Sequence, residues 1–306
     1  MAWPMRLIAV LVLLGGVLAG ALVLGAGEWL TRSAARTVGA APIDLAAQTV
    51  RIATQDGGEL VGWFARGAPG AGAVLLLHGV RSDRRQMLPR ARALHAAGYA
   101  VLLVDLQAHG ESSGERITFG AREGAGVVAA LAFLRHAQPG ERIGVIGVSL
   151  GAASLVLAHP RPAPDAVVLE SMYPTLAEAV ANRLQTVLGP LGRHLAPLLL
   201  WQMPLRLGLH ADALRPIDAV ARLGAPLLLV SGREDRHTTW QETERIFAAA
   251  LPPKALWPVE QAAHVDLYAA QAPAYAARVF GFLSVHLRTQ AGQDRAPGPA
   301  AGMGGT

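Results

Sequence analysis

One serine in the sequence has the surroundings of a catalytic nucleophile. Ser149 lies in the stretch GVIGVSLGAAS, between a short apolar run and a run of helix formers. A serine on a sharp strand-to-helix turn needs small neighbours, which Gly147, Gly151 and Ala152 provide. The N-terminus of the following helix would direct free N–H groups at the reacting oxygen. Gly-x-Ser-x-Gly also occurs in ordinary turns, so the prediction of a nucleophile depends on partner residues elsewhere in the chain.

A base and an acid occur in the order that such a site requires. A serine hydroxyl is a weak nucleophile at neutral pH and needs a base that is held by an acid. Asp235 lies three residues past an apolar run that ends at Gly232, and His264 follows a later short strand. Both lie where the carboxyl ends of parallel strands are expected, as Ser149 does. The chain order therefore predicts Ser149 as nucleophile, His264 as base and Asp235 as the orienting carboxylate.

Acyl transfer also needs two backbone N–H donors for the developing oxyanion. One is expected from Leu150, the residue after the nucleophile. The other is expected from the loop after the run LLLHG, at Val80.

Two other groups of residues offer rival interpretations. Glu170 ends another predicted strand and could serve as the acid. Asp235 is favoured because it follows the strand whose end more commonly carries the acid of such a triad. Asp105, His109 and Ser112 could form a second triad. We expect them instead to shape the loop after their strand, with the Asp105 side chain accepting local backbone hydrogen bonds.

Four residues could also be drawn as a metal site, because oxygen and imidazole ligands suit zinc or manganese. They are Asp235, His237, His264 and Asp266. The triad and its flanking residues explain this group better, so we expect no metal and no cofactor.

The remaining segments predict a domain of alternating strands and helices. Near-continuous apolar runs suit parallel strands that are buried on both faces. Helical stretches such as 84–97 and 120–137 are long enough to connect them as crossovers. A glycine-turn hairpin at 49–66 precedes them, so we expect a three-layer α/β fold with a mostly parallel sheet and helices on both faces. The apolar runs are Ala73–Gly79, Ala100–Leu106, Arg142–Val148, Ala166–Ser171 and Pro226–Gly232, with a shorter strand near Ala255–Val259.

A proline-interrupted segment at about 172–223 breaks this alternation. Each proline favours the start or end of a helix, so we expect a small helical lid here. The predicted domain spans 46–288 and includes this lid. Residues 28–45 are predicted as a linker. Residues 289–306, rich in Gly, Pro and Ala, are predicted as a disordered tail.

The composition excludes several classes of site. The 306 residues include no cysteine, which excludes disulfides, thiolate zinc sites and cysteine nucleophiles. The net charge of +5 comes almost wholly from scattered arginines, without the basic block and interleaved aromatics typical of nucleic-acid binding. We therefore expect no nucleic-acid partner, and the sequence leaves the oligomeric state open.

An uncharged apolar stretch at residues 7–27 predicts a membrane-spanning helix. At ~1.5 Å per residue it would span ~30 Å, about the hydrocarbon thickness of a bilayer. A cleaved signal peptide is the alternative, but its apolar region is usually only ~7–15 residues long. We expect residues 1–27 to form an uncleaved single-pass anchor, with the large domain on the exported side of the membrane.

Over about Ala46–Leu287 the chain resembles the α/β-hydrolase superfamily. The closest resemblance is to bacterial, membrane-anchored serine hydrolases of the esterase and serine-aminopeptidase-like group. The resemblance implies the same three catalytic residues and the same two oxyanion donors. One departure is the loop VRSDRRQM, which stands where many lipases have several glycines and argues against bulky tertiary-alcohol esters. The shared marks are His78-Gly79, DLQAHGESSG (105–114), GVSLG (147–151), GRED ending at Asp235, and His264.

We therefore expect a serine hydrolase that works through an acyl-enzyme. The apolar lid and the anchor favour a small-molecule substrate with an apolar acyl chain, and hence a carboxylesterase. Acyl-thioesterase, amidase and peptidase activities use the same groups and stay open, as does a catalytically inactive, membrane-tethered binding module. Because His264 must be neutral to act as the base, activity is expected to fall at acid pH, with a limb near ~6–7.

Overall fold

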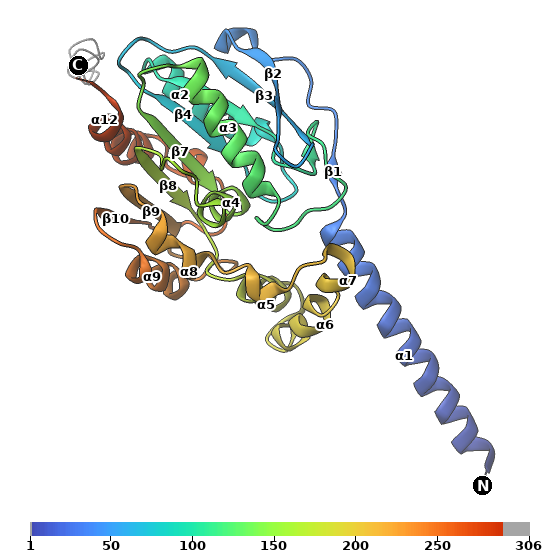
Figure 1. Cartoon of the computed structure of the whole chain (residues 1–306). Coiled ribbons are helices and arrows are strands. Elements are labelled where there is room, and N and C mark those ends of the chain that lie inside the picture. Colours follow the sequence, from blue (N-terminus) through green and yellow to red (C-terminus); the bar gives the residue numbers. More distant parts are fainter. Residues whose placement is uncertain (1, 290–306) are drawn as a thin grey trace, which may run out of the picture.

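Eight strands form the central sheet, in the order β10-β9-β8-β7-β4-β5-β3-β2 (Figure 1). The computed structural model describes residues 2–289. Strands β4, β5 and β7 to β10 pair in parallel, whereas β3 pairs antiparallel with both β2 and β5. The predicted mostly parallel sheet, preceded by a hairpin, is confirmed. The strands are β2 (Gln48–Ala53), β3 (Glu59–Ala65), β4 (Ala73–Leu77), β5 (Ala100–Val104), β7 (Ile143–Val148), β8 (Ala166–Glu170), β9 (Leu227–Gly232) and β10 (Lys254–Val259).

The central strands are apolar on both faces because helices cover both faces. In β4, Leu75 and Leu77 belong to one buried cluster, and Val74 and Leu76 belong to a second cluster on the opposite face. The first face is covered by α3 (Glu123–Ala137), α4 (Leu150–Ala158) and α9 (Trp240–Ala249). The second is covered by η2 (Arg84–Met87), α2 (Leu88–Ala96), α10 (Leu267–Ala270), α11 (Ala272–Tyr275), the π-helical turn η6 (Ala276–Phe280) and α12 (Gly281–Leu287).

Short helices fill the connection between β8 and β9, at the position predicted for a lid. We call residues 172–223 the helical insertion. Prolines lie in the first turns of α6, α7 and α8. Backbone N–H groups in a first turn have no partner within the helix, so the N–H that proline lacks is not needed there. The helices are α5 (Leu176–Leu188), η3 (Gly192–Leu195), α6 (Ala196–Leu200), α7 (Met203–Leu207), η4 (Ala211–Ala213), α8 (Pro216–Ala219) and η5 (Val220–Arg222).

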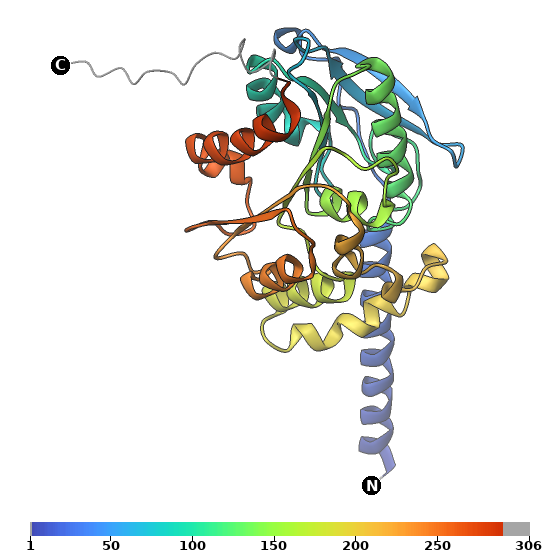
Figure 2. The same cartoon turned by 60° about the vertical axis from the view of Figure 1, so that its left-hand side comes forward.

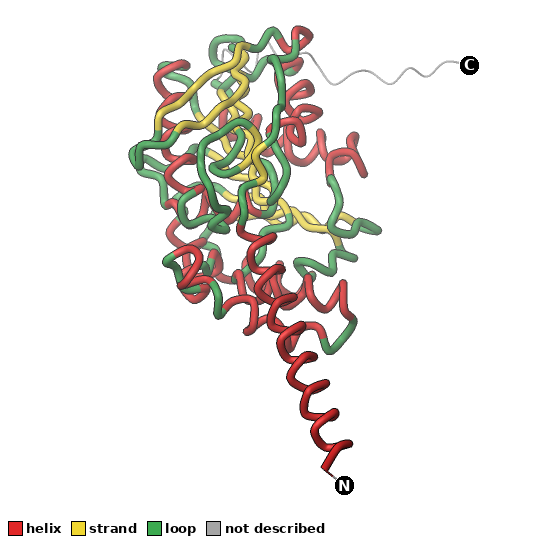
Figure 3. The backbone as a smooth tube through the Cα atoms, turned by 90° about the vertical axis from the view of Figure 1, so that its right-hand side faces the viewer, coloured by secondary structure: helices red, strands yellow, loops and turns green. Residues whose placement is uncertain are grey.

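A long apolar helix, α1 (Ala2–Thr31), projects from one end of the domain (Figure 3). Within residues 2–289 it is the one helix that is long and apolar enough to cross a membrane. Most of its apolar span, Met5–Thr31, is exposed, and only the last turns, with the buried Gly27 and Thr31, pack against the domain. The helix thus continues four residues past the predicted end at Gly27.

The segment after α1 is held against the domain by backbone hydrogen bonds. Strand β1 (Ala34–Ala35) pairs in parallel with β6 (His109–Gly110), and the Ser33 N–H donates to the Glu115 carbonyl over 3.0 Å. The 3-10 turn η1 (Ile43–Leu45) then leads into β2. Apart from its first residue, the predicted tail lies outside the described residues.

Candidate active site

Ser149 lies on the turn between β7 and α4, in a conformation that non-glycine residues rarely adopt. Its φ is 48° and its ψ is −106°. Its N–H donates to the Glu170 carbonyl over 2.8 Å, which fixes the turn to the end of β8. The two flanking glycines are required sterically. A Cβ on Gly147 would lie 2.7 Å from the Ala152 nitrogen, and a Cβ on Gly151 would lie 2.6 Å from the Leu77 oxygen.

The loop after β4 lies beside this turn, where an oxyanion donor is expected. A Cβ on Gly79 would lie 3.9 Å from the Ser149 Cβ, so the loop backbone passes close to the serine. Within residues 2–289, neither the Val80 N–H nor the Leu150 N–H donates a hydrogen bond. Both predicted donors are therefore available to a bound oxygen.

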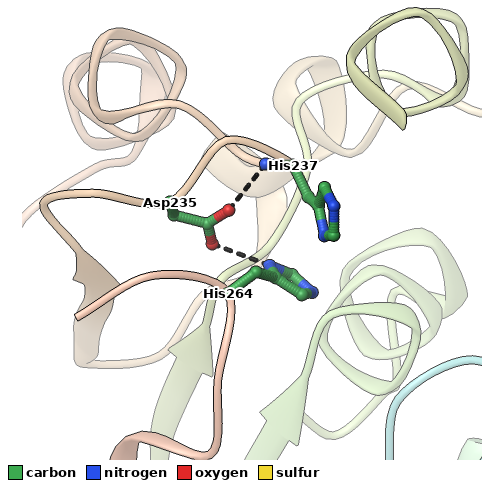
Figure 4. A group of neighbouring side chains, drawn as sticks. All are labelled: Asp235, His237 and His264. Carbon is green, nitrogen blue, oxygen red and sulfur yellow. Dashed lines mark hydrogen bonds and ion pairs between the residues drawn. The ribbon is translucent and has the colours of Figure 1, made fainter. Parts of the chain in front are cut away.

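Asp235 and His264 are joined by a hydrogen bond, with 2.7 Å between Oδ2 and Nδ1 (Figure 4). The other oxygen of Asp235 accepts the His237 and Thr238 N–H groups over 2.8 and 2.9 Å. Burial would raise the pKa of the Asp235 carboxyl, but the His264 hydrogen bond and the two N–H groups hold it below its ordinary value. An ionised Asp235 accepts the Nδ1 proton and leaves Nε2 of His264 as the basic atom.

The three predicted catalytic residues arise at one edge of the sheet. Ser149 follows β7, Asp235 follows β9 and His264 follows β10, and these strands are parallel. Within the described chain, Ser149 Oγ makes no hydrogen bond to His264. The structure thus contains the Asp235–His264 hydrogen bond and places Ser149 at the same edge of the sheet.

His237, which sequence analysis named only as a metal candidate, packs against the His264 ring. The two ring centroids are 4.8 Å apart at an interplanar angle of 59° (Figure 4). Burial, followed by the charges of Arg183 and His264, lowers the pKa of His237 to about 4. Arg183 belongs to α5, and its Nη1 lies 3.3 Å from Nε2 of His237. No motif marks His237, because its partners come from distant parts of the chain.

Two further histidines hold the loop that carries Val80. The Leu106 N–H donates to Nε2 of His78 over 2.9 Å, and the Arg81 N–H donates to Nε2 of His109 over 3.0 Å. Each ring is therefore unprotonated at Nε2 and carries its proton on Nδ1. Burial is the main cause that lowers the pKa of His78 to about 4 and that of His109 to about 3. Two neutral imidazoles thus shape the loop.

Neither rival acid contacts a histidine in the way that Asp235 does. Asp105 accepts the Arg84 and Glu111 N–H groups over 2.7 and 2.9 Å, and it forms a buried ion pair with the Arg84 side chain. This confirms the expectation that Asp105 shapes its loop. Glu170 is paired with Arg90 over 2.8 Å.

The ligand atoms of Asp235, His237 and His264 lie within 4.8 Å of one another, so they form a group of metal-ligand type. The donor set fits a metal poorly. Both oxygens of Asp235 already accept hydrogen bonds, and one of these comes from His264 itself. Asp266, the fourth residue of the predicted group, is paired with Arg90 over 2.8 Å.

A cavity of about 280 Å³ lies at the opposite edge of the sheet. Leu227 at the start of β9 and Pro252-Pro253 before β10 are among its lining residues. Ligands of parallel sheets bind beyond the carboxyl ends of the strands, so this cavity is not part of the candidate site.

The sequence is similar to one known family and to bacterial proteins. Residues 68–212 match the serine aminopeptidase family S33. An uncharacterised protein of Mycobacterium tuberculosis is 35% identical over 225 residues, which cover 72% of this chain and 73% of that protein. The uncharacterised protein YqkD of Bacillus subtilis is 25% identical over 215 residues, which cover 69% of this chain and 70% of that protein.

Solved structures have the same arrangement of strands and helices. The esterase Pf2001 of Pyrococcus furiosus superposes with a TM-score of 0.68 at 26% identity, covering 82% of this chain and 97% of that one. The α/β hydrolase GrgF of a Penicillium species gives a TM-score of 0.62, covering 79% of this chain and 99% of that one. At 18% identity, the second match is a likeness of fold alone.

Proposed function

Because the chain belongs to the α/β-hydrolase superfamily, we propose that it is a serine hydrolase that cleaves carboxylic esters. Ser149 is the nucleophile, His264 the general base and acid, and Asp235 the orienting carboxylate. The observation that carries this proposal is the 2.7 Å hydrogen bond between Asp235 and His264 at the sheet edge that also bears Ser149.

The reaction follows from the roles of these groups. Ser149 Oγ attacks the ester carbonyl carbon while Nε2 of His264 takes the hydroxyl proton. The Val80 and Leu150 N–H groups bind the oxyanion of the tetrahedral intermediate. His264 then gives its proton to the departing alcohol, which leaves an acyl-enzyme. Water then attacks the acyl carbon while His264 takes its proton. His264 returns that proton to Ser149 Oγ as the carboxylic acid leaves.

A small-molecule ester with an apolar acyl chain fits the surroundings best. The helical insertion is rich in apolar side chains, among them Leu198, Leu199 and Trp201. The similarity to the esterase Pf2001 favours an ester. Thioesters, amides and peptides would use the same residues, so a panel of these substrates tests the preference. Turnover of peptides without turnover of esters would contradict it.

We propose further that α1 is an uncleaved anchor and that the hydrolase domain lies on the exported side. The length of α1 supports the anchor. The orientation rests on Arg6, a basic residue at the N-terminal end of the apolar helix. A protease added to spheroplasts should remove the domain, whereas a domain on the cytoplasmic side would be protected.

Labelling by a fluorophosphonate probe tests the nucleophile. The wild-type protein in detergent should be labelled, and Ser149→Ala should not. Ser154→Ala is the matched control, because Ser154 lies on α4, which begins directly after Ser149, but is buried and donates to the Leu150 carbonyl over 2.7 Å. Labelling that survives in Ser149→Ala, or a folded wild-type protein that neither reacts with the probe nor cleaves an ester, would overturn the proposal.

A further inference from the structure

The end of α1 is joined to the helical insertion by polar contacts. Gln202, which is buried, donates from Nε2 to the Val23 carbonyl over 3.0 Å. Arg206 donates from Nη2 to the Leu24 carbonyl over 2.7 Å, and its Nη1 lies 2.5 Å from Oε2 of Glu28. The insertion is therefore fixed to the last turns of the apolar helix.

The junction is closely packed and also includes the core of the domain. A Cβ on Gly27 would lie 2.4 Å from Oε1 of Gln202, so a side chain at this position would displace the Gln202 amide from its hydrogen bond. The second oxygen of Glu28 is 2.6 Å from Nη1 of Arg116, which follows β6. One carboxylate thus links α1 to both the insertion and the core.

The helical insertion exposes large apolar side chains in the elements next to this junction. Leu191 is 79% exposed, Trp201 67% and Leu205 76%. Such a concentration of exposed apolar groups is unfavourable in water and marks an interaction surface. We call these residues, with three neighbours, the apolar patch. It consists of Leu188, Leu191, Leu195, Leu198, Trp201 and Leu205.

The position of the junction along α1 bears on what covers the apolar patch. At ~1.5 Å per residue, Val23 and Leu24 lie only ~10–12 Å before the end of the apolar span at Thr31. Figure 2 shows the insertion, in yellow, crossing α1 near the point where the helix enters the domain. Helices at this level of a spanning segment lie in the membrane interface, with apolar faces ~5–10 Å deep. Tryptophan and arginine, here Trp201 and the exposed Arg193, are the residues that such an interface favours.

We propose that the apolar patch is a second membrane contact, seated in the lipid bilayer that holds α1. The inference rests on the anchoring role proposed for α1, since without that anchor the patch would not be held at the interface. The bilayer covers the exposed leucines and Trp201, while Gln202 and Arg206 turn inward to the junction. A substrate dissolved in the lipid would then meet the helical insertion directly.

The absence of cysteine permits a direct test, because a single introduced cysteine can be labelled with an environment-sensitive fluorophore. Leu198→Cys and Leu205→Cys probe the patch, Val17→Cys probes the anchor, and His136→Cys, on the exposed end of α3, is the control. Each labelled full-length protein is reconstituted in phosphatidylcholine vesicles. Quenching is measured with a spin-labelled lipid and with aqueous iodide.

Positions 198 and 205 should be quenched at least twofold more by the lipid quencher than position 136, and they should be shielded from iodide. If position 17 is quenched by lipid while 198 and 205 behave like 136, the patch proposal is overturned and the anchor stands. If position 17 is itself outside the lipid, both the anchor and the patch proposals fail.

A pair of glycine substitutions tests the junction. Gly27→Leu displaces the Gln202 amide, whereas a Cβ on Gly20 meets nothing within 4 Å, so Gly20→Leu is the matched control. Gly27→Leu should reduce lipid quenching at position 198 and leave position 17 unchanged. Equal quenching at position 198 in both variants would show that the junction does not determine how the apolar patch lies in the bilayer.

Discussion

Arg90 on α2 and Glu170 at the end of β8 form a buried ion pair, with 2.8 Å between Nη2 and Oε2. The same nitrogen lies 2.8 Å from Oδ1 of Asp266, two residues after His264. The backbone carbonyl of Glu170 accepts the Ser149 N–H. One guanidinium therefore ties the residue that supports the proposed nucleophile to the loop of the proposed base.

Replacing Arg90 by methionine should destabilise the domain by about 3–5 kcal/mol, because Glu170 would be left as an uncompensated buried charge. Arg92→Met is the matched control, since Arg92 lies on the same helix and pairs with Asp44 at the surface over 2.6 Å. An exposed pair contributes at most about 1 kcal/mol. Denaturant unfolding in detergent would measure both, and equal losses would contradict the role given to the buried pair.

Asp235→Asn should lower kcat/KM for a p-nitrophenyl ester by about 10³–10⁴-fold, because the amide no longer fixes the imidazole tautomer or stabilises its positive charge. The fold should persist, since the asparagine oxygen can still accept the His237 and Thr238 N–H groups. Asp218→Asn changes an exposed ion pair with Arg215 and should leave kcat/KM unchanged. A tenfold or smaller loss in Asp235→Asn would argue against an orienting acid at this position.

Gly151→Ala should destabilise the turn by about 1–3 kcal/mol, because the new methyl group would meet backbone oxygens of Leu77 and His78 at 2.6 and 2.8 Å. Gly281→Ala places its methyl group in open space at the start of α12 and should be neutral or slightly stabilising. Thermal unfolding compares the two variants. A Gly151→Ala protein as stable as the wild type would mean that the turn can open without cost.

Acid should destabilise the domain as pH falls from about 6.5 to about 4. The pKa of His78 is lowered to about 4 in the folded protein, so the unfolded chain binds more protons throughout this interval. Stability therefore rises with pH across the interval, by on the order of 3 kcal/mol for a fully buried histidine. His109, with a pKa of about 3, acts in the same direction.

Thermal unfolding midpoints between pH 7 and pH 4.5 measure this dependence. His78→Asn lacks the titrating ring and should show a smaller fall in midpoint than the wild-type protein, whatever its stability at pH 7. Parallel pH profiles for the two proteins would show that His78 is not the group responsible.

The parts of this fold that could be predicted from the sequence are the strands with continuous apolar runs and the residues whose order along the chain is fixed by the fold. The five-residue apolar runs of β4 and β5 predict buried parallel strands because every side chain in them is covered. The glycines around Ser149 and the order of Asp235 and His264 predict one sheet edge, because connections in such a fold follow fixed rules.

Contacts between distant segments could not be predicted in this way. His237 acquires its place beside His264 through Arg183 of α5, more than 50 residues earlier, and neither residue lies in a motif. Strand β1 has only two residues, too few for an alternating pattern. Helix α1 continues past Gly27, and there Glu28 pairs with Arg116 and Arg206, contacts that spacing along the chain does not reveal.

The close connection between α1 and β1 has a mechanical consequence. The apolar span of 27 residues measures ~40 Å, which matches the ~30 Å hydrocarbon core of a typical bilayer plus the interface at the end of α1, so a thinner bilayer would tilt an embedded α1. The Thr31 carbonyl accepts the Ile117 N–H over 2.7 Å, which leaves no slack to absorb that tilt. The domain would lean with the helix, and the thickness of the surrounding lipid would set the angle at which the carboxyl edge of the sheet faces the membrane.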